Sequence, residues 1–346
     1  MKQVEYIIVG NGYAAIFFAH QLIRNCKSFL LFSDKKRGAS HISAGIINPV
    51  VLKRFTTFWL ANEQISALEE TLSQIEEYTG ENYLISEPIL RIFHDETEKK
   101  LWLKKSSDED LCTFFSKNFI TLEKLNNPFD CGLVKQSARL NVTAFFEDFF
   151  AYLEKKGQLL HQKFDYQKLL PSENRYDDIN YQKIVFAEGM EVQNNPFFSE
   201  IPVLHNKGHH LEVQLSVPIE ANYTIKKKHF LFPKSENTYY YGGTYDREES
   251  EDVVDENQVK DLSESLAEFY PHDFEIKSVE FGFRPTVKDR RPILGNHQEF
   301  TNLFVFNGLG ARGVLNGNYF AKELFDHINL GKPIHPEVDW KRFTKE

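Results

Sequence analysis

The sequence is poor in cysteine, and its cysteines are not spaced as ligands or as a redox pair. Only Cys26, Cys112 and Cys131 occur in 346 residues, and no two of them form a C-x-x-C motif. They are typical of free thiols in a reducing compartment, so we expect a cytoplasmic protein. No cluster of cysteine, histidine and carboxylate residues has metal-ligand spacing, and we therefore expect no metal site.

Long apolar runs and an excess of positive charge are also lacking. No run of about 18 apolar residues is present, and the first residues show no signal-peptide pattern, so we expect no membrane span and no secretion. A net charge of −9 disfavours nucleic acid as the main partner, because phosphate binding requires a basic surface. With 41% hydrophobic residues, the chain can form sizeable cores in two domains.

A glycine-containing turn stands close to the beginning of the sequence. The stretch "EYIIVGNGYAAIFFA" (5–19) predicts a buried strand, a turn, and an apolar helix from about Ala14. Gly10 permits a tight turn, Gly12 lets the backbone approach a pyrophosphate, and Ala15 is small enough for close helix–strand packing. The free N–H groups of the helix would then face the phosphates. By itself this G-x-G-x-x-A spacing is also compatible with a tight turn that holds no ligand.

The second predicted strand, Phe29–Phe32, is followed by Ser33 and Asp34. An acidic side chain about 20 residues after the glycines contacts the ribose of an adenine nucleotide in dinucleotide-binding folds. Ser33 occupies the position where that acid is most expected, and Asp34 is the available carboxylate. Which of the two holds the ribose stays open at this point.

Elements of the strand–turn–helix type recur in the middle and near the end of the chain, separated by two stretches of mostly antiparallel character. This order predicts an α/β fold in which a Rossmann-like FAD-binding domain is interleaved with a smaller α+β substrate domain built on an antiparallel sheet. The first domain comprises 1–81, 139–202 and 282–346, and the second comprises 82–138 and 203–281. A glycine turn at each end of such a domain is typical of proteins that hold a long flavin cofactor.

Four segments together resemble the D-amino-acid-oxidase-like superfamily of FAD-dependent oxidoreductases. They are "VGNGYAA", "ASHISAGIINP", "KIVFAEG" and "GFRPTVKDRRPILG…NLFVFNGLGARGV", and they occur in the order of the family over nearly the whole chain. The superfamily includes glycine oxidase, sarcosine oxidase and the oxidase domain of a bifunctional tRNA wobble-uridine modification enzyme. "AGIINPV" with "EPILRIF" resembles a bacterial subgroup for which no substrate follows from the resemblance.

The resemblance implies that the chain binds FAD, with the opening glycines at the pyrophosphate and the terminal turn at the pyrimidine end of the flavin. A helix N-terminus there stabilises negative charge on the reduced ring. The implied cofactor-binding residues are Gly10, Gly12, Tyr13, Ala14, Ala15, Ser33, Asp34, Ser40, His41, Ala44, Gly45, Gly189, Gly308, Leu309, Gly310, Ala311, Arg312 and Gly313.

We expect this FAD to be noncovalent. Relatives with covalent flavin carry a linking histidine in the loop that here reads "SHISAG", but His41 falls one position early and Ile42 takes the matching place. The last third of the chain has no cysteine, which excludes a cysteinyl linkage there.

The implied reaction is oxidation of the C–N bond of an amino acid or N-substituted glycine by hydride transfer to flavin N5. Arg284 matches the arginine that holds the substrate carboxylate in glycine oxidase, and a planar guanidinium suits that bidentate pair. A structural ion pair, for instance with Asp289, is the alternative. Tyr241 and Tyr245 are further candidates for the pocket, although tyrosines in a sheet more often serve in core or surface packing.

Two other functions stay open. The first is a tRNA wobble-uridine-modifying oxidase, which the acidic net charge disfavours. The second is a non-catalytic flavin-binding protein, because fold does not determine function. Two further side chains stand out next to each other, His209 and His210. Neighbours in a strand point to opposite faces, which argues against one shared metal site.

Overall fold

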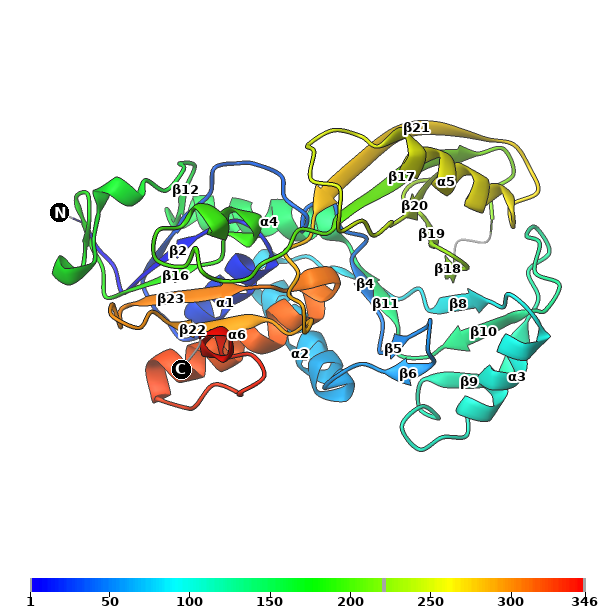
Figure 1. Cartoon of the computed structure of the whole chain (residues 1–346), viewed down its shortest axis with the longest axis horizontal. Coiled ribbons are helices and arrows are strands. Elements are labelled where there is room, and N and C mark those ends of the chain that lie inside the picture. Colours follow the sequence, from blue (N-terminus) through cyan, green and yellow to red (C-terminus); the bar gives the residue numbers. More distant parts are fainter. Residues whose placement is uncertain (1, 220–221, 345–346) are drawn as a thin grey trace.

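The computed structural model describes residues 2–219 and 222–344, which form two lobes lying side by side (Figure 1). The first lobe is built around a parallel sheet in which β22 alone runs antiparallel to its neighbour. Its strands, in spatial order, are β12 (Leu159–Leu160), β3 (Phe29–Phe32), β2 (Tyr6–Val9), β16 (Lys183–Phe186), β23 (Leu303–Asn307) and β22 (Ile293–Asn296).

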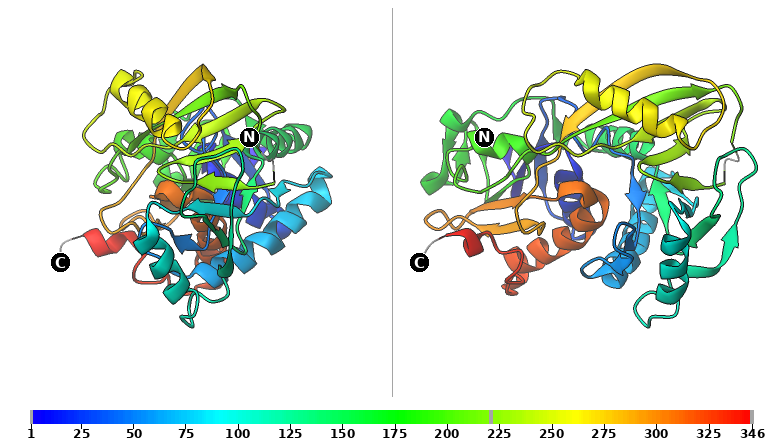
Figure 2. Two further views of the ribbon diagram at one scale, coloured as in Figure 1. Left: turned by 90° about the vertical axis from the view of Figure 1, so that its right-hand side faces the viewer. Right: turned by 45° about the vertical axis from the view of Figure 1, so that its right-hand side comes forward.

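Both faces of this parallel sheet are buried, which explains the continuous apolar runs of its strands. Along β2, Tyr6 and Ile8 pack on the helical side, whereas Ile7 and Val9 pack on the opposite side. Figure 2 shows the helices grouped on one side of the sheet. The opposite side is covered by a small sheet of β1 (Lys2–Gln3), β15 (Ile179–Asn180), β14 (Arg175–Tyr176) and β13 (Leu169–Leu170).

Three of the described helices begin at a side-chain cap. Side chains of Asp95, Asn141 and Asp255 accept backbone N–H groups at the starts of α3, α4 and α5, whereas α1 and α6 have no side-chain cap. The described α-helices are α1 (Tyr13–Arg24), α2 (Ala61–Thr79), α3 (Glu96–Lys105), α4 (Val142–Lys155), α5 (Glu256–Ala267) and α6 (Gly313–Leu330). Short 3₁₀ turns are η1 (Tyr166–Lys168), η2 (Pro171–Glu173), η3 (Gly189–Asn194), η4 (Gly310–Arg312) and η5 (Trp340–Phe343).

The second lobe is built on a large sheet that α5 covers from outside (Figure 2). Its strands are β21 (Phe274–Phe283), β17 (Lys207–Leu215), β20 (Thr238–Gly242), β19 (Phe230–Pro233), β18 (Thr224–Lys226), β8 (Ile89–Ile92), β10 (Cys131–Val134) and β9 (Phe115–Ile120). Smaller pairings join β4 (Ile46–Ile47), β11 (Ala138–Leu140) and β7 (Leu84–Ile85), and β5 (Val50–Val51) with β6 (Thr56–Thr57).

The interleaved α/β architecture confirms the fold class expected from the sequence. The large sheet differs in one detail, because β18 pairs parallel to β8 while its other neighbouring pairs are antiparallel. The division of the chain into five alternating segments of two domains stays a prediction. It is supported by the sheets, because strands from segments of the same predicted domain share one sheet. The first predicted boundary, after residue 81, is only approximate. The hairpin β5–β6 precedes it in the sequence, but Val50 and Phe55 pack in one hydrophobic cluster with Trp102 of α3, which follows it.

Candidate functional site

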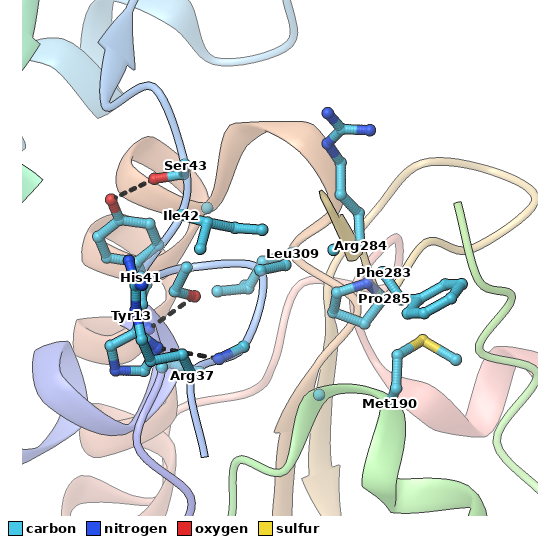
Figure 3. A pocket seen from close by; sticks show the side chains of 18 of the residues that line it. Tyr13, Arg37, His41, Ile42, Ser43, Met190, Phe283, Arg284, Pro285 and Leu309 are labelled. Carbon is cyan, nitrogen blue, oxygen red and sulfur yellow. Dashed lines mark hydrogen bonds between the residues drawn. The ribbon is translucent and has the colours of Figure 1, made fainter. Parts of the chain in front are cut away.

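A cavity of ≈ 540 Å³ lies between the parallel sheet and the large sheet. Its walls come from the turn after β2, the loop 36–46, the segment after β16, the turn before α6, and strands β17, β20 and β21. Figure 3 shows Tyr13, His41 and Ser43 on one side of this cavity and Phe283, Arg284 and Pro285 on the other.

The start of α1 forms an anion-binding end of the cavity. Gly10 has φ 124°, a conformation that favours glycine, and a Cβ there would overlap the carbonyl oxygen of Ala187. Gly12 is the N-cap of α1 and has no side chain to occupy the helix N-terminus; a Cβ on it would lie 2.9 Å from Ser40 Oγ. The N–H of Gly10 donates to the carbonyl oxygen of Phe32 and that of Tyr13 donates to Ser40 Oγ, so a phosphate group would be met by the other N–H groups at this helix start, such as those of Gly12 and Ala14.

The end of β3 distinguishes the two candidates for the ribose contact. Ser33 is buried, and its Oγ accepts from Asn11 Nδ2 at 3.2 Å and from the backbone N–H of Lys35. Asp34 is exposed and lines the cavity. Of the two, Asp34 is therefore the one that reaches the cavity, while Ser33 is bonded within the turn.

The loop 36–46 is anchored on the first lobe by its polar residues. Ser40 Oγ accepts from the backbone N–H of Tyr13 at 3.2 Å, and the Tyr13 and Ser43 hydroxyls lie 2.7 Å apart. The ring of His41 packs 4.3 Å from that of Phe146, and burial lowers the pKa of His41 to about 4. Its Nδ1 accepts from the N–H of Gly38, so the ring is neutral and already engaged by the protein.

The turn before α6 places its backbone and the guanidinium of Arg312 at the wall of the same cavity. Leu309, Gly310 and Gly313 line it, and α6 starts there without a side-chain cap. Arg312 donates from Nη1 to the carbonyl oxygen of Asn48 at 3.0 Å, and its guanidinium lies 4.2 Å above the Phe58 ring. Burial lowers the pKa of Arg312 to about 10, which leaves it charged at neutral pH. This end of the cavity is therefore electropositive.

Arg284 extends into the cavity from the end of β21, as Figure 3 shows. Its Nη1 donates to the carbonyl oxygen of Thr244 at 3.0 Å, and its guanidinium lies 4.5 Å from the Tyr245 ring centroid. Within the part of the chain that the structure describes, no carboxylate forms an ion pair with it. Asp289, the partner considered as an alternative, binds Arg342 instead.

The two tyrosine candidates lie in different places. Tyr245 is 64% exposed and lines the cavity under Arg284. Tyr241 does not line it, contrary to the expectation: its ring is fully buried against α5, and its hydroxyl lies 2.9 Å from Ser265 Oγ. The neighbouring Tyr240 faces the cavity in its place, because alternate residues of a strand point to opposite faces.

Most other residues expected at the cofactor line the cavity. Those that do are Gly10, Gly12, Tyr13, Ala14, Asp34, Ser40, His41, Ala44, Gly45, Gly189, Leu309, Gly310, Ala311, Arg312 and Gly313. Ala15, Ser33 and Gly308 lie behind it. Ala15 is fully buried in the helix–strand core and Gly308 abuts Val287, so both act through packing.

Sequence reasoning missed several cavity residues on the large sheet, among them Phe230, Tyr240 and the cavity role of His210. The signal for them was the glycine content of neighbouring strands. Gly208, Gly242 and Gly282 lie on the cavity face of three successive strands and carry no side chain there. His210 and Phe230 lie in register with Gly242 on the two strands beside it, and Tyr240 lies two residues before Gly242 on the same face.

The segment after β16 contributes a carboxyl group at the edge of the cavity. Glu188 accepts hydrogen bonds from the Tyr166 hydroxyl and from Asn195 Nδ2, yet burial raises the pKa of Glu188 to about 7. A carboxyl group with a pKa of about 7 is about half protonated at pH 7, so it adds less negative charge beside a phosphate-binding turn than a fully ionised one would.

None of the helices in the described ranges is both long and apolar enough to cross a membrane.

A family model described as "DAO: FAD dependent oxidoreductase" matches residues 5–327. The chain belongs to this family. It is therefore an FAD-dependent oxidoreductase, and the uncapped start of α1, the exposed Asp34 and the electropositive turn before α6 fit the pyrophosphate, ribose and flavin ends of FAD.

Solved structures with the same fold include glycine oxidase from Bacillus cereus, with a TM-score of 0.79 and 18% identity over 96% of each chain. Iminodiacetate oxidase from Chelativorans sp. BNC1 has a TM-score of 0.79 and 18% identity over 98% of each chain. Identities this low show the fold alone.

Two curated relatives are longer than this chain. The bifunctional protein ThiO/ThiG of Trichormus variabilis is 23% identical over 99% of this chain and 55% of its own length. The tRNA 5-methylaminomethyl-2-thiouridine biosynthesis bifunctional protein MnmC of Vibrio campbellii is 22% identical over 96% of this chain and 57% of its own length. The chain thus spans about half the length of these relatives.

The position of His41 leads to a prediction about the cofactor linkage. Because its Nδ1 is engaged by Gly38 and its ring is packed on Phe146, we expect acid or heat denaturation to release intact FAD into the supernatant. Absorbance and mass of the released flavin measure this. Yellow colour that stays with the precipitate, and disappears from it in His41→Ala, would show that the linkage is covalent after all.

Proposed function

We propose that this enzyme oxidises the C–N bond of a small amino acid or N-substituted glycine. Arg284 is the observation that carries the proposal, because it is a half-buried guanidinium at the cavity with no carboxylate partner among the described residues. A substrate carboxylate supplies the charge that this site lacks.

The surroundings of Arg284 suit a bidentate pair. A Cβ on Gly208 would overlap its guanidinium, and one on Gly243 would lie 2.9 Å from Nη2, so these two glycines leave the space in which the arginine lies. Tyr245 supports one face of the guanidinium. Together the two glycines and Tyr245 orient the two terminal nitrogens of the Arg284 guanidinium toward the cavity without neutralising its charge.

When bound, FAD supplies the hydride acceptor for this chemistry. The contribution of the chain is orientation and electrostatics: Arg284 fixes the carboxylate, and the aromatic side chains of Phe230 and Tyr240 restrict the space around the remaining substrate. The substrate nitrogen must carry a free lone pair for its α-carbon to lose a hydride, so an ammonium group has to lose a proton first.

A second candidate function is removal of a carboxymethyl group from a wobble uridine in tRNA. The similarity to MnmC along 96% of this chain favours it, whereas the net charge of −9 does not. Both reactions break a C–N bond next to a carboxylate, so they use Arg284 in the same way.

The test is anaerobic bleaching of the oxidised flavin by a panel of glycine, N-methylglycine, iminodiacetate and proline, beside a tRNA carrying 5-carboxymethylaminomethyluridine. Reduction by one of the small amines at millimolar concentration is expected. Reduction by the modified tRNA alone would establish the second function. An unchanged flavin spectrum with every compound would contradict both and favour a flavin-binding protein without this activity.

A further inference from the structure

His210 lies on the cavity face of the large sheet, next to the place where Arg284 rests. On β17, Gly208 and His210 are two residues apart and point to the same face, about 7 Å from each other. The Arg284 guanidinium lies against Gly208. An amino acid bears its carboxylate and its amine on one carbon. With a hydrogen bond of about 2.9 Å at each end, such a molecule spans the distance from the Arg284 guanidinium to the His210 ring.

A carboxylate and an aromatic ring fix the orientation of His210. Its side chain is 7% exposed, and its Nε2 lies 3.3 Å from Glu280 Oε2 on the adjacent strand β21. Its ring is stacked 4.4 Å from that of Tyr240 on β20. These two strands flank β17, so the ring is held from both sides.

Glu280 is an anion in this arrangement. The hydrogen bond from His210, the positive charge that His210 carries when protonated, and the charge of Arg37, whose Nη1 lies 3.1 Å from Glu280 Oε1, hold the pKa of Glu280 at about 2 despite partial burial. An ionised carboxylate only accepts hydrogen bonds, so the neutral imidazole carries its proton on Nε2. The lone pair is then on Nδ1, which has no hydrogen-bond partner in residues 2–219 and 222–344 and is not among the enclosed polar atoms.

We propose that His210 is the amine subsite of this enzyme and that its Nδ1 accepts the proton that the substrate ammonium loses, with Glu280 as the positioning residue. The inference rests on the proposed function. One N–H bond of the ammonium breaks and one N–H bond forms at Nδ1. The positive charge moves from the substrate nitrogen to an imidazolium next to Glu280, and no electrons are exchanged in this step.

The other charged or titratable groups near His210 are each paired or assigned to another contact, so they do not compete with it for the substrate amine. Arg37 is paired with Glu280, and Tyr240 is kept protonated because burial raises its pKa. Lys226 lies in the same cross-strand row beyond Phe230, where its Nζ is above the Phe230 ring. Arg284 is assigned to the carboxylate. Burial lowers the pKa of Lys226 to about 7, but its ammonium is directed at Phe230, which leaves the imidazole of His210 as the proton-accepting group next to the substrate.

The experiment compares wild-type holoenzyme with His210→Asn and Glu280→Gln, using the amine of the panel that reduces the flavin. His272→Asn, an exposed histidine on the same lobe, is the matched control. At pH 7, His210→Asn should reduce its flavin about a hundredfold more slowly, and the rate should rise tenfold per pH unit as neutral amine accumulates in solution. Glu280→Gln should move the acid limb of the kcat/KM profile to lower pH, because the imidazolium loses its counter-charge.

Two readouts separate this role from a structural one. Glycolate, which has the carboxylate but no amine, should bind His210→Asn as tightly as wild type, and added imidazole should recover part of the lost rate. A wild-type pH profile in His210→Asn would overturn the inference, and so would joint loss of FAD, glycolate binding and activity. If no amine reduces the wild-type flavin, the proposed function fails and this inference with it, whereas normal reduction without any effect of His210→Asn refutes the inference alone.

Discussion

Replacing Arg284 with methionine should lower kcat/KM for a carboxylate substrate about a hundredfold, which corresponds to about 3 kcal/mol of lost transition-state stabilisation. Methionine has a similar length but lacks the charge and the fork. Because the described part of the chain offers Arg284 no carboxylate partner, the substitution leaves no orphaned anion in the protein. FAD content and melting temperature should therefore stay close to wild type.

Lysine is the informative second substitution at this position. Arg284→Lys should recover little of the lost kcat/KM, because an ammonium is a point charge and cannot form two parallel hydrogen bonds to a carboxylate. A control for the loss of one arginine is Arg175→Met, whose side chain pairs with Glu173 on the small sheet behind β2. That variant should retain full activity.

Steady-state kinetics with the amine of the panel measure these effects. Near wild-type turnover of a carboxylate substrate by Arg284→Met would show that the carboxylate is bound elsewhere, and Arg312 would then be the next candidate. Loss of FAD together with a lowered melting temperature would mark Arg284 as a structural residue.

The sequence was sufficient for the fold and for most of the residues that line the cavity at the starts of α1 and α6, because both depend on local patterns. A buried strand, a glycine turn and an apolar helix are contiguous in the chain, so Gly10, Gly12 and the start of α1 could be placed before any tertiary contact was known. The same holds for Gly308–Gly313 before α6.

The substrate end depended on long-range register, which local patterns do not contain. Tyr240 and Tyr241 are equivalent in the sequence, and only the pairing of β20 with β17 and β19 decides which of them faces the cavity. A shift of one residue moves a side chain to the opposite face. For the same reason the partnership of His210 with Glu280 was not visible, since 70 positions separate them in the chain.

The burial of two neighbouring side chains helps to choose between the two ribose-contact candidates that the sequence left open. Ser33 and Asp34 are neighbours with similar capacity to accept a hydrogen bond from a ribose hydroxyl. The first is buried and bonded to Asn11, and the second lines the cavity. That supports Asp34 as the ribose contact, which remains a proposal until Asp34→Asn is shown to weaken FAD binding.

Gly12→Val should yield a protein that is expressed and folded but purifies without FAD. The side chain would project at the N-cap of α1, where the backbone must approach the pyrophosphate, and we expect at least a hundredfold weaker binding, or about 2.8 kcal/mol. Flavin absorbance of the purified protein and titration of the stripped protein with FAD measure the effect. The melting temperature of the FAD-free form should match that of stripped wild type.

The neighbouring Ser40 allows a sharper test, because two steric causes compete at Gly12. A Cβ there would lie 2.9 Å from Ser40 Oγ, so even Gly12→Ala could act by displacing the loop 36–46 instead of by blocking a phosphate. The double variant Gly12→Ala/Ser40→Ala removes the clash with the loop and keeps the methyl group at the helix N-terminus. If the space at Gly12 is needed for the phosphate, the double variant should bind FAD as weakly as Gly12→Ala does. Ser40→Ala alone gives the FAD affinity expected when only the Ser40 hydroxyl is lost. Recovery to that affinity would instead show that Gly12 is required for packing against Ser40, and the anion-binding role of this turn would be refuted.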